Sequence, residues 1–213
     1  DDSYVDSGSP TGNFGSSVDI NLQSPNLDDY FKFNVSGLTQ AVQTAIIRLY
    51  VTDYSPDAGT IYAVSNYYQG TSTPWLETGL TWNNAPIIGG TPLSSGGVAN
   101  VGTWVEFDVT NAISGNGTYS FGIDTSSTNT AGYNSSEASS NQPQFIIIQV
   151  PAPTPTATRT PTPTRTPTAT LSPTPGGPPV VGETVTASSG SSQVNSISVA
   201  SITGGTNQLV VVT

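Results

Sequence analysis

Short runs of alternating apolar and polar residues recur through residues 1–150, and this pattern constrains the fold more than any other feature of the chain. Clusters of Gly, Pro, Asn and Ser separate the runs, and no run shows a helical period. The pattern predicts half-buried strands, because side chains alternate between the two faces of a strand. The predicted strands are residues 4–5, 18–22, 30–35, 45–51, 60–64, 103–108, 119–124 and 145–150.

In three of these strands the inward face can be predicted from the alternation. The expected buried sets are Phe31, Phe33 and Val35; Ile47, Leu49 and Val51; and Val105, Phe107 and Val109. Repeated half-buried strands over this length predict two sheets packed face to face. The fold class is therefore expected to be all-β, a two-sheet jelly-roll sandwich over residues 1–150. A single helical turn is expected at residues 110–114.

Residues 151–179 differ sharply in composition, with 10 Pro and 10 Thr. Proline fixes φ and removes a backbone donor, so this segment is expected to form a polyproline II linker instead of a helix or a strand. Thr/Pro tracts of this kind are often O-glycosylated. The predicted attachment sites are Thr156, Thr160, Thr162, Thr164 and Thr168.

Residues 180–213 return to a strand-like pattern, with a hairpin signal at Gly204-Gly205. The segment ends in a continuous apolar run, yet it is too short to bury that run by itself. It is therefore expected to pair with a sheet that it does not contain. The predicted assembly residues are Ile197, Val199, Leu209, Val210, Val211 and Val212.

Charge and composition exclude several functions. The chain has no Cys and no His, which excludes disulfides, thiolate or imidazole metal sites and His-based catalytic triads. Its net charge is −10 with only four cations, so it lacks what a nucleic-acid binder needs. Its apolar runs are too short to insert into a membrane. The start at Asp1 without Met indicates a removed secretory signal, and we expect a secreted or cell-surface protein.

Seven phrases, taken in order, resemble secreted bacterial and archaeal jelly-roll modules known as DNRLRE domains. They are DSYVD (2–6), NFG (13–15), AIIRLY (45–50), LTWNNAP (80–86), WVEFDVT (104–110), GTYSFG (117–122) and SSE (135–137). The resemblance spans residues 1 to about 150 and implies a jelly-roll sandwich in a modular cell-surface protein, often with Thr/Pro linkers. Some of these domains are classed as carbohydrate-binding modules with affinity for alginate.

The chain departs from this family in charge. Family members often carry Arg where Ser136 stands, and residues 1–150 hold only Lys32 and Arg48 against 13 acidic residues. An anionic polymer would be repelled by such a domain. The sequence therefore predicts neutral glycans as ligands in place of polyuronates.

Aromatic residues are the candidates for glycan contact, because aromatic rings stack on the C–H faces of sugars. Tyr67, Tyr68 and Trp75 are the predicted contact residues. The alternative is core packing, since aromatics supply much of the buried area of a sandwich. Trp82, beside the expected turn at Asn83-Asn84 and Pro86, is predicted to be mainly structural.

Carboxylates are the candidates for metal binding and for catalysis. Asp2, Asp6, Asp28 and Asp29 are predicted as possible Ca²⁺ ligands, with Asp1 and Asp124 as further oxygens. Solvated loop carboxylates are the alternative, and no other cofactor is expected. The candidates for the catalytic acid and base of a glycosidase are Glu77, Glu106 and Glu137. Nothing in the sequence sets their separation, and we expect a protein without catalytic activity.

Two functions follow from these features. In the first, the chain is a subunit of an extracellular filament, a homopolymer in which the C-terminal β segment completes the sheet of a neighbouring copy. In the second, it is a carbohydrate-binding or adhesive module of a larger secreted protein. A glycan-active enzyme is a third hypothesis, but the sequence contains no recognisable catalytic site.

Overall fold

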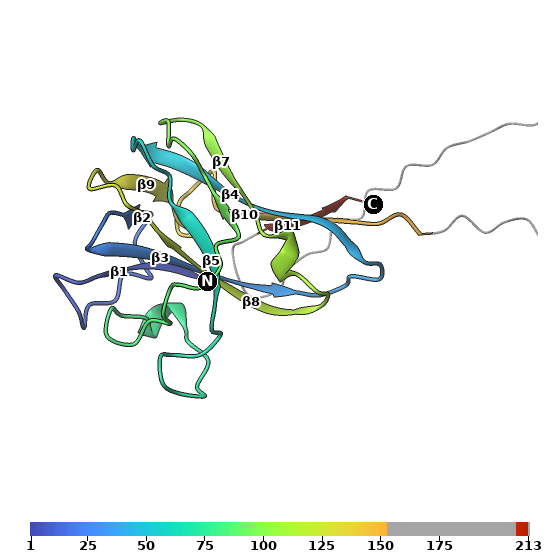
Figure 1. The fold of residues 1–213 in the computed structure, drawn as a ribbon, viewed down its shortest axis with the longest axis horizontal. Helices are drawn as coiled ribbons and strands as arrows, with labels where there is room; N and C mark the ends of the chain where they lie inside the picture. The colour runs from blue at the N-terminus through green and yellow to red at the C-terminus, as the bar shows by residue number, and fades with distance from the viewer. Residues whose placement is uncertain (153–207, 213) are drawn as a thin grey trace, which may run out of the picture. The chain divides into compact units, whose positions relative to one another are not determined.

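The computed structural model describes residues 1–152 and 208–212 (Figure 1). Two 3₁₀ turns, η1 (Glu77–Gly79) and η2 (Thr110–Ala112), interrupt an otherwise all-β chain. The strands are β1 (Asp2–Asp6), β2 (Asp19–Leu22), β3 (Leu27–Val35), β4 (Val42–Asp53), β5 (Thr60–Val64), β6 (Ser94–Ser95), β7 (Trp104–Asp108), β8 (Gly117–Asp124), β9 (Ala131–Asn134), β10 (Gln144–Gln149) and β11 (Gln208–Val212).

The strands form two sheets, which confirms the predicted all-β sandwich. The first sheet has the order β1-β3-β8-β5-β6, and each of its neighbouring pairs is antiparallel. The second sheet has the order β11-β10-β4-β9-β2, with β7 also paired to β4. The long β4 joins three partners, pairing β10 and β7 along its body and β9 at its end. Chain crossovers between the two sheets therefore bring distant segments into one core.

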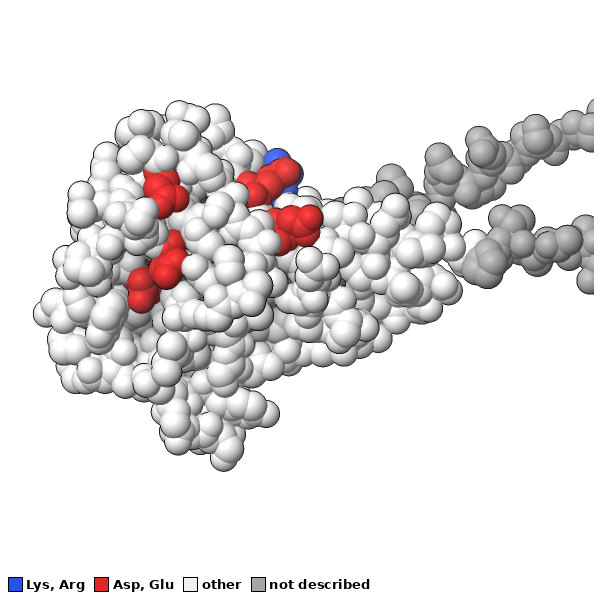
Figure 2. Space-filling view, viewed as in Figure 1, with Lys and Arg blue, Asp and Glu red and all other residues white. Residues whose placement is uncertain are grey.

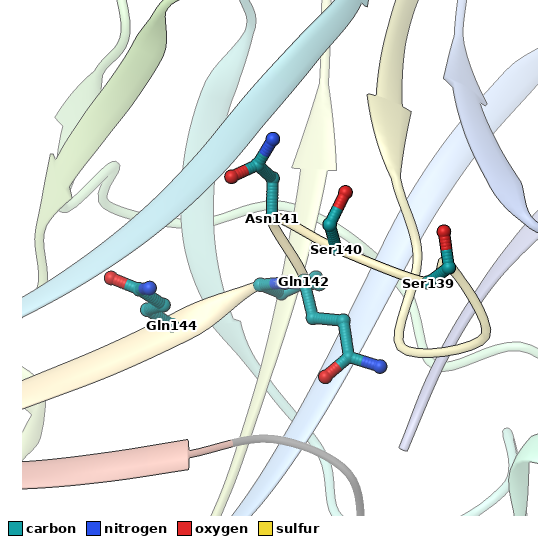
Figure 3. A pocket seen from close by; sticks show the side chains of 6 residues that line it. Ser139, Ser140, Asn141, Gln142 and Gln144 are labelled. Carbon is teal, nitrogen blue, oxygen red and sulfur yellow. The ribbon is translucent and has the colours of Figure 1, made fainter.

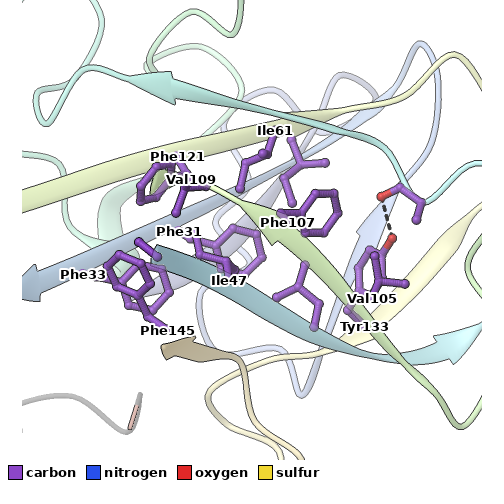
Figure 4. Close-up of a cluster of buried hydrophobic side chains, with 14 of the residues drawn as sticks. Phe31, Phe33, Ile47, Ile61, Val105, Phe107, Val109, Phe121, Tyr133 and Phe145 are labelled. Atoms are coloured by element: carbon purple, nitrogen blue, oxygen red, sulfur yellow. Dashed lines mark hydrogen bonds between the residues drawn. The ribbon is translucent and has the colours of Figure 1, made fainter. Parts of the chain in front are cut away.

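The core lies between the sheets and contains all three predicted inward-facing sets, each member at most 4% exposed. Figure 4 shows Phe33, Phe121 and Phe145 in one group, with ring centroids of Phe33 and Phe145 4.8 Å apart. The Tyr133 hydroxyl, buried in the same core, donates to the carbonyl of Ala58 at 2.7 Å. Burial of these side chains is the main stabilising term of the domain.

Two strands were not expected from the sequence. Strand β9 is short and contains Gly132, so its pattern resembles a loop, yet Ala131 and Tyr133 are fully buried. Strand β6 has only two residues, too few for any alternation to show. The expected helical turn at 110–114 is a shorter 3₁₀ turn, η2. These short elements are defined by pairing with distant strands, which local sequence does not encode.

The C-terminal apolar run pairs with a sheet, as expected, but that sheet is the chain's own. Strand β11 lies parallel to β10, from Gln144 opposite Gln208 to Ile148 opposite Val212. The prediction that Leu209, Val210, Val211 and Val212 complete a neighbouring copy is therefore not supported. Three other predictions lie outside the described residues. They concern the assembly residues Ile197 and Val199, the linker over residues 153–179, and the glycosylation sites Thr156, Thr160, Thr162, Thr164 and Thr168.

Residues 1–152 are expected to fold without the C-terminal segment, because every buried core residue described lies between Val5 and Ile147. A fragment of residues 1–152 should unfold in a single cooperative thermal transition, measured by circular dichroism, and should sediment as a monomer. A fragment that stays unfolded would show that β11 supplies an essential part of the second sheet.

Candidate functional site

A long loop between β5 and β6, residues 65–93 and here called the covering loop, packs on the outer face of the first sheet. With β1 and β3 it forms a second apolar cluster, whose buried members are Val5, Tyr30, Trp75, Leu80 and Ala85. Strand β3 is consequently buried on both faces, with Tyr30 3% and Lys32 7% exposed. Alternation alone would leave this face of β3 in solvent.

Trp75 anchors the covering loop. Its side chain is fully buried, and its indole N–H donates to the carbonyl of Ser65 at 3.2 Å. The Lys32 ammonium lies 3.8 Å from the centre of the indole ring and donates to the carbonyl of Trp75. Such a cation–π contact is strengthened by desolvation. Burial also lowers the pKa of Lys32 to about 8.

The far end of the covering loop is fixed to β3 and β8. The Tyr30 hydroxyl donates to the carbonyl of Pro86 at 2.8 Å. Gly122 on β8 allows Ile88 to approach, because a Cβ at this position would lie 2.6 Å from Ile88 Cγ1. The Asn84 side chain closes the intervening turn by accepting from the Thr81 N–H at 2.7 Å and donating to the Gly79 carbonyl at 2.9 Å. The turn expected around Asn84 therefore exists and is rigidly held.

Between the covering loop and the sheet lies a cavity of about 300 Å³, here called the groove. Its polar side chains come from both layers: Asp28 and Asp124 from the sheet, and Gln69 from the loop. Trp82, only partly buried, supplies its aromatic surface. The remaining lining residues are Val5, Tyr30, Ala85, Pro86, Ile87 and Ile88. The exposed lining of the groove is more polar than apolar, and its polar side chains converge on one space.

Strand register places the two carboxylates of the groove opposite each other. Because Asp29 pairs with Ile123 and Tyr30 with Gly122, Asp28 faces Asp124 at the ends of β3 and β8. Side chains in such positions lie about 4.5–5.5 Å apart at Cβ. Burial, with the Asp124 carboxylate as a second cause, raises the pKa of Asp28 to about 6. Burial also raises the pKa of Asp124.

The cations of the described residues are already engaged elsewhere. Lys32 is under Trp75, and Arg48 on the second sheet pairs with Glu106 at 2.9 Å. The Arg48 guanidinium also lies 4.7 Å from the ring centre of Trp104, so it covers the aromatic face that a sugar would need. Figure 2 shows a mostly uncharged surface with several acidic patches, and blue atoms only beside one of them.

The predicted glycan-contact residues lie together in the covering loop, but they do not form a shared binding surface. The assignment of Trp75 is wrong, because its side chain is fully buried and serves as an anchor. Tyr68 is half-buried, and its hydroxyl accepts from the Leu76 N–H at 3.1 Å. Tyr67 is 44% exposed but does not line the groove. Trp82 and Gln69 line it instead, and only the fold of the loop shows this.

The predicted Ca²⁺ ligands do not form one site. Among residues 1–152 and 208–212 the structure contains no group of three or more acidic side chains placed to hold a metal ion. Strand alternation separates the four predicted residues: Asp28 faces the groove, whereas Asp29 is on the core side of β3. On β1, Asp2 lies opposite Phe31 and Asp6 lies opposite Leu27.

Several acids gather within the fold near Ser136. The Ser136 N–H donates to both carboxylate oxygens of Asp2 at 3.1 Å, and its hydroxyl donates to Glu137 at 3.1 Å. Glu77 accepts from the Asp2 N–H at 3.1 Å. Because Ser136 is only 4% exposed, its side chain faces these carboxylates instead of the solvent. Of the three Glu considered for catalysis, Glu106 lies apart, on the second sheet.

Burial dominates the electrostatics of this acidic group. It raises the pKa of Asp2 to about 6, with the Glu137 charge as a further cause. Burial followed by the Glu137 and Asp2 charges raises the pKa of Glu77 to about 7. Asp29 is fully buried, neither of its carboxyl oxygens has a hydrogen-bond partner, and burial raises its pKa well above the usual range. Burial therefore shifts each of these carboxyls toward its protonated form, compared with the same carboxyl in water.

A second cavity, of about 260 Å³, lies in the polar turn before β10 (Figure 3). Ser139, Ser140, Asn141, Gln142, Pro143 and Gln144 line it. The Gln142 amide is occupied by the carbonyls of Ser136 and Ala138. This cavity has no aromatic or charged lining residue, so the groove is the better candidate site.

The two packed sheets define a β-sandwich domain. The sequence model of carbohydrate-binding module family 96 matches residues 1–149, and the chain belongs to this family. It is a family of binding modules and not of catalytic domains. A comparison with curated proteins gives no match.

None of the helices in the part of the chain that the structure describes is long and apolar enough to cross a membrane.

Replacing the anchor of the covering loop should destabilise the domain strongly. Trp75→Ala is expected to lower the free energy of unfolding by about 3–5 kcal/mol, because it removes a fully buried aromatic side chain and leaves a cavity. Urea unfolding followed by circular dichroism measures this loss. Tyr67→Ala is the control in the same loop and should change stability by less than about 0.5 kcal/mol. A small loss for Trp75→Ala would contradict the anchoring role.

The buried carboxyls predict stability that falls as pH rises. Their pKa values are raised in the folded state, so between about pH 4.5 and pH 7 the folded chain binds more protons than the unfolded chain. The stability that these groups contribute should therefore be fully present below about pH 3.8 and should decline as the pH rises to about 7. Thermal unfolding across this range measures the slope.

Glu77→Gln should make this decline shallower, because it removes the group whose pKa is raised to about 7 while keeping an acceptor for the Asp2 N–H. Glu106→Gln on the second sheet is the matched control. An unchanged slope in Glu77→Gln would mean that this carboxyl titrates alike in the folded and unfolded chain.

Proposed function

We propose that the domain binds a glycan without acidic groups in the groove and acts as the targeting or adhesive module of a larger extracellular protein. The observation that carries this proposal is the position of Trp82 beside Asp28, Asp124 and Gln69 in one cavity. The family supports glycan binding in general. The choice of site and ligand rests on the geometry of the groove.

The groove has the chemistry that recognition of a sugar requires. A sugar ring presents apolar C–H groups on its faces and hydroxyls around its edge. The half-buried Trp82 offers an apolar aromatic surface, and the carboxylates of Asp28 and Asp124 accept hydrogen bonds from hydroxyls. The Gln69 amide both donates and accepts. These groups come from opposite sides of the groove, so they can contact the face and the edge of one ring.

Charge opposes the binding of polyuronates. The groove contains two carboxylates, and the two cations of residues 1–152 are held by Trp75 and by Glu106. An acidic sugar would meet like charge without a compensating partner. This observation supports the prediction of a ligand without carboxylate groups.

In this proposal residues 151–179 remain a predicted spacer, with the threonines named above as predicted sites of O-glycosylation. A spacer of this composition would separate the module from the next domain of a secreted protein. We infer an extracellular location because the ligands of such a module are glycans found outside the cell.

Trp82→Ala should weaken glycan binding by about tenfold or more, because it removes the aromatic surface of the groove. Titration calorimetry with neutral oligosaccharides measures the loss, and circular dichroism checks that the variant is folded. Trp104→Ala is the matched control, an aromatic replacement on the second sheet that should leave affinity unchanged. Loss of binding in Trp104→Ala or Tyr67→Ala, but not in Trp82→Ala, would move the site away from the groove.

A further inference from the structure

The groove contains an arrangement that sugar hydroxyls alone do not explain. Asp28 and Asp124 lie opposite each other on neighbouring strands, where like charges repel. Their carboxylates have no side-chain hydrogen-bond partner among the contacts of the described residues. A directly opposed pair of ionised carboxylates on a partly desolvated sheet face is unfavourable unless a proton or another cation joins it.

No group on the surrounding elements supplies that cation in the part of the chain that the structure describes. Strand β1 contributes Val5 to the groove, and the covering loop contributes only uncharged residues. On β3, Tyr30 bonds Pro86 and Lys32 bonds Trp75, so neither neutralises the pair. Tyr62 on β5 lies near Asp124. The pKa of Tyr62 is raised mainly by burial and, to a lesser extent, by the Asp124 charge.

The nearby acids add to the negative potential. In addition to burial, the Asp57 charge raises the pKa of Asp124. The Asp28 charge likewise adds to the effect of burial on the pKa of Asp29, on the opposite face of β3. All the charged groups that face the pair from its surroundings are therefore acidic, apart from the engaged Lys32. The groove is a negative cavity with Trp82 among its lining residues.

An ammonium group satisfies each of these features. It forms charge-assisted hydrogen bonds with carboxylates, and it is attracted to the face of an indole. A calcium ion is less suitable, because it takes six to eight oxygen ligands and the groove offers two carboxylates and one amide. A cavity of about 300 Å³ is at the small end of ligand sites and suits about one sugar residue.

We propose that the groove selects a hexosamine whose amine is free and protonated, held between Asp28 and Asp124 beside Trp82. This proposal rests on the proposed glycan-binding function and narrows its ligand class. The pair discriminates through charge, because acetylation of the amine removes the cation and leaves the carboxylates unpaired. A glucosamine oligomer should therefore bind at least about tenfold more tightly than its fully N-acetylated counterpart.

The test is titration calorimetry of the full chain with three tetrasaccharides of matched length: a glucosamine oligomer, its N-acetylated form and a glucose oligomer. Measurements are made at pH values from 6 to 7, because the pKa of Asp28 is raised to about 6 and its carboxylate form increases over this range. Asp28→Asn and Asp124→Asn keep the shape of each side chain but remove its charge. In both variants the preference for the glucosamine oligomer over the acetylated oligomer should fall to near unity.

Asp53→Asn is the matched control, because it makes the same charge change on an exposed residue of β4. It should keep the preference of the unmodified chain. If the preference falls equally in Asp53→Asn, the effect comes from net charge and the proposal is overturned.

The remaining outcomes separate this proposal from the proposed function. Equal or tighter binding of the acetylated or glucose oligomer, lost in Trp82→Ala, would overturn the hexosamine assignment while leaving glycan binding in the groove intact. Failure of all three oligomers to bind would overturn the hexosamine assignment and count against the groove itself. Tight binding of Ca²⁺ alone, lost in Asp28→Asn, would assign the pair to a metal and overturn the proposal.

Discussion

The packing of the covering loop on the outer face of the first sheet is the interaction on which the rest of the structure depends. Without it, Tyr30 and Lys32 would lie on a solvated sheet face, and the sandwich would have one core instead of two. Trp75 is the largest fully buried side chain of the loop, and the Lys32 ammonium joins the loop to β3 through the ring and the carbonyl of Trp75. The groove exists only because this loop stands over the ends of β3 and β8.

The distribution of charge follows from the same packing. A domain with 13 acids and two cations over residues 1–150 cannot pair most of its carboxylates. The fold places several of them where they are partly or fully buried, beside Ser136, on the core side of β3 and in the groove. Burial then raises the pKa values of Asp2, Asp28 and Glu77. The proposed ligand would offset the cost of an unpaired carboxylate in the groove.

The sheets were predictable to a large extent, whereas the site was not. Alternation in β3, β4 and β7 gave the correct inward faces because burial between two sheets follows a period of two. No such periodicity was available for Trp75, whose predicted contact with glycans is wrong, whereas Trp82 packs against the second apolar cluster as its predicted structural role requires. Both are tryptophans in one polar loop, yet one is fully buried under Lys32 and the other lines the groove. Asp28 and Asp124 are far apart in sequence, and only the register of β3 with β8 brings them opposite each other.

The amino-acid sequence by itself determined the all-β class, the extent of the sandwich over the first 150 residues and the shortage of cations that disfavours acidic ligands. These properties depend on local periodicity and on composition, which need no knowledge of distant contacts. Tertiary structure decided which tryptophan anchors the covering loop and which lines the groove. It also decided which carboxylates lie opposite each other and with which strand the C-terminal strand pairs. Each of those depends on the pairing of segments remote in sequence, and the free energy of that pairing is a property of the whole packed domain.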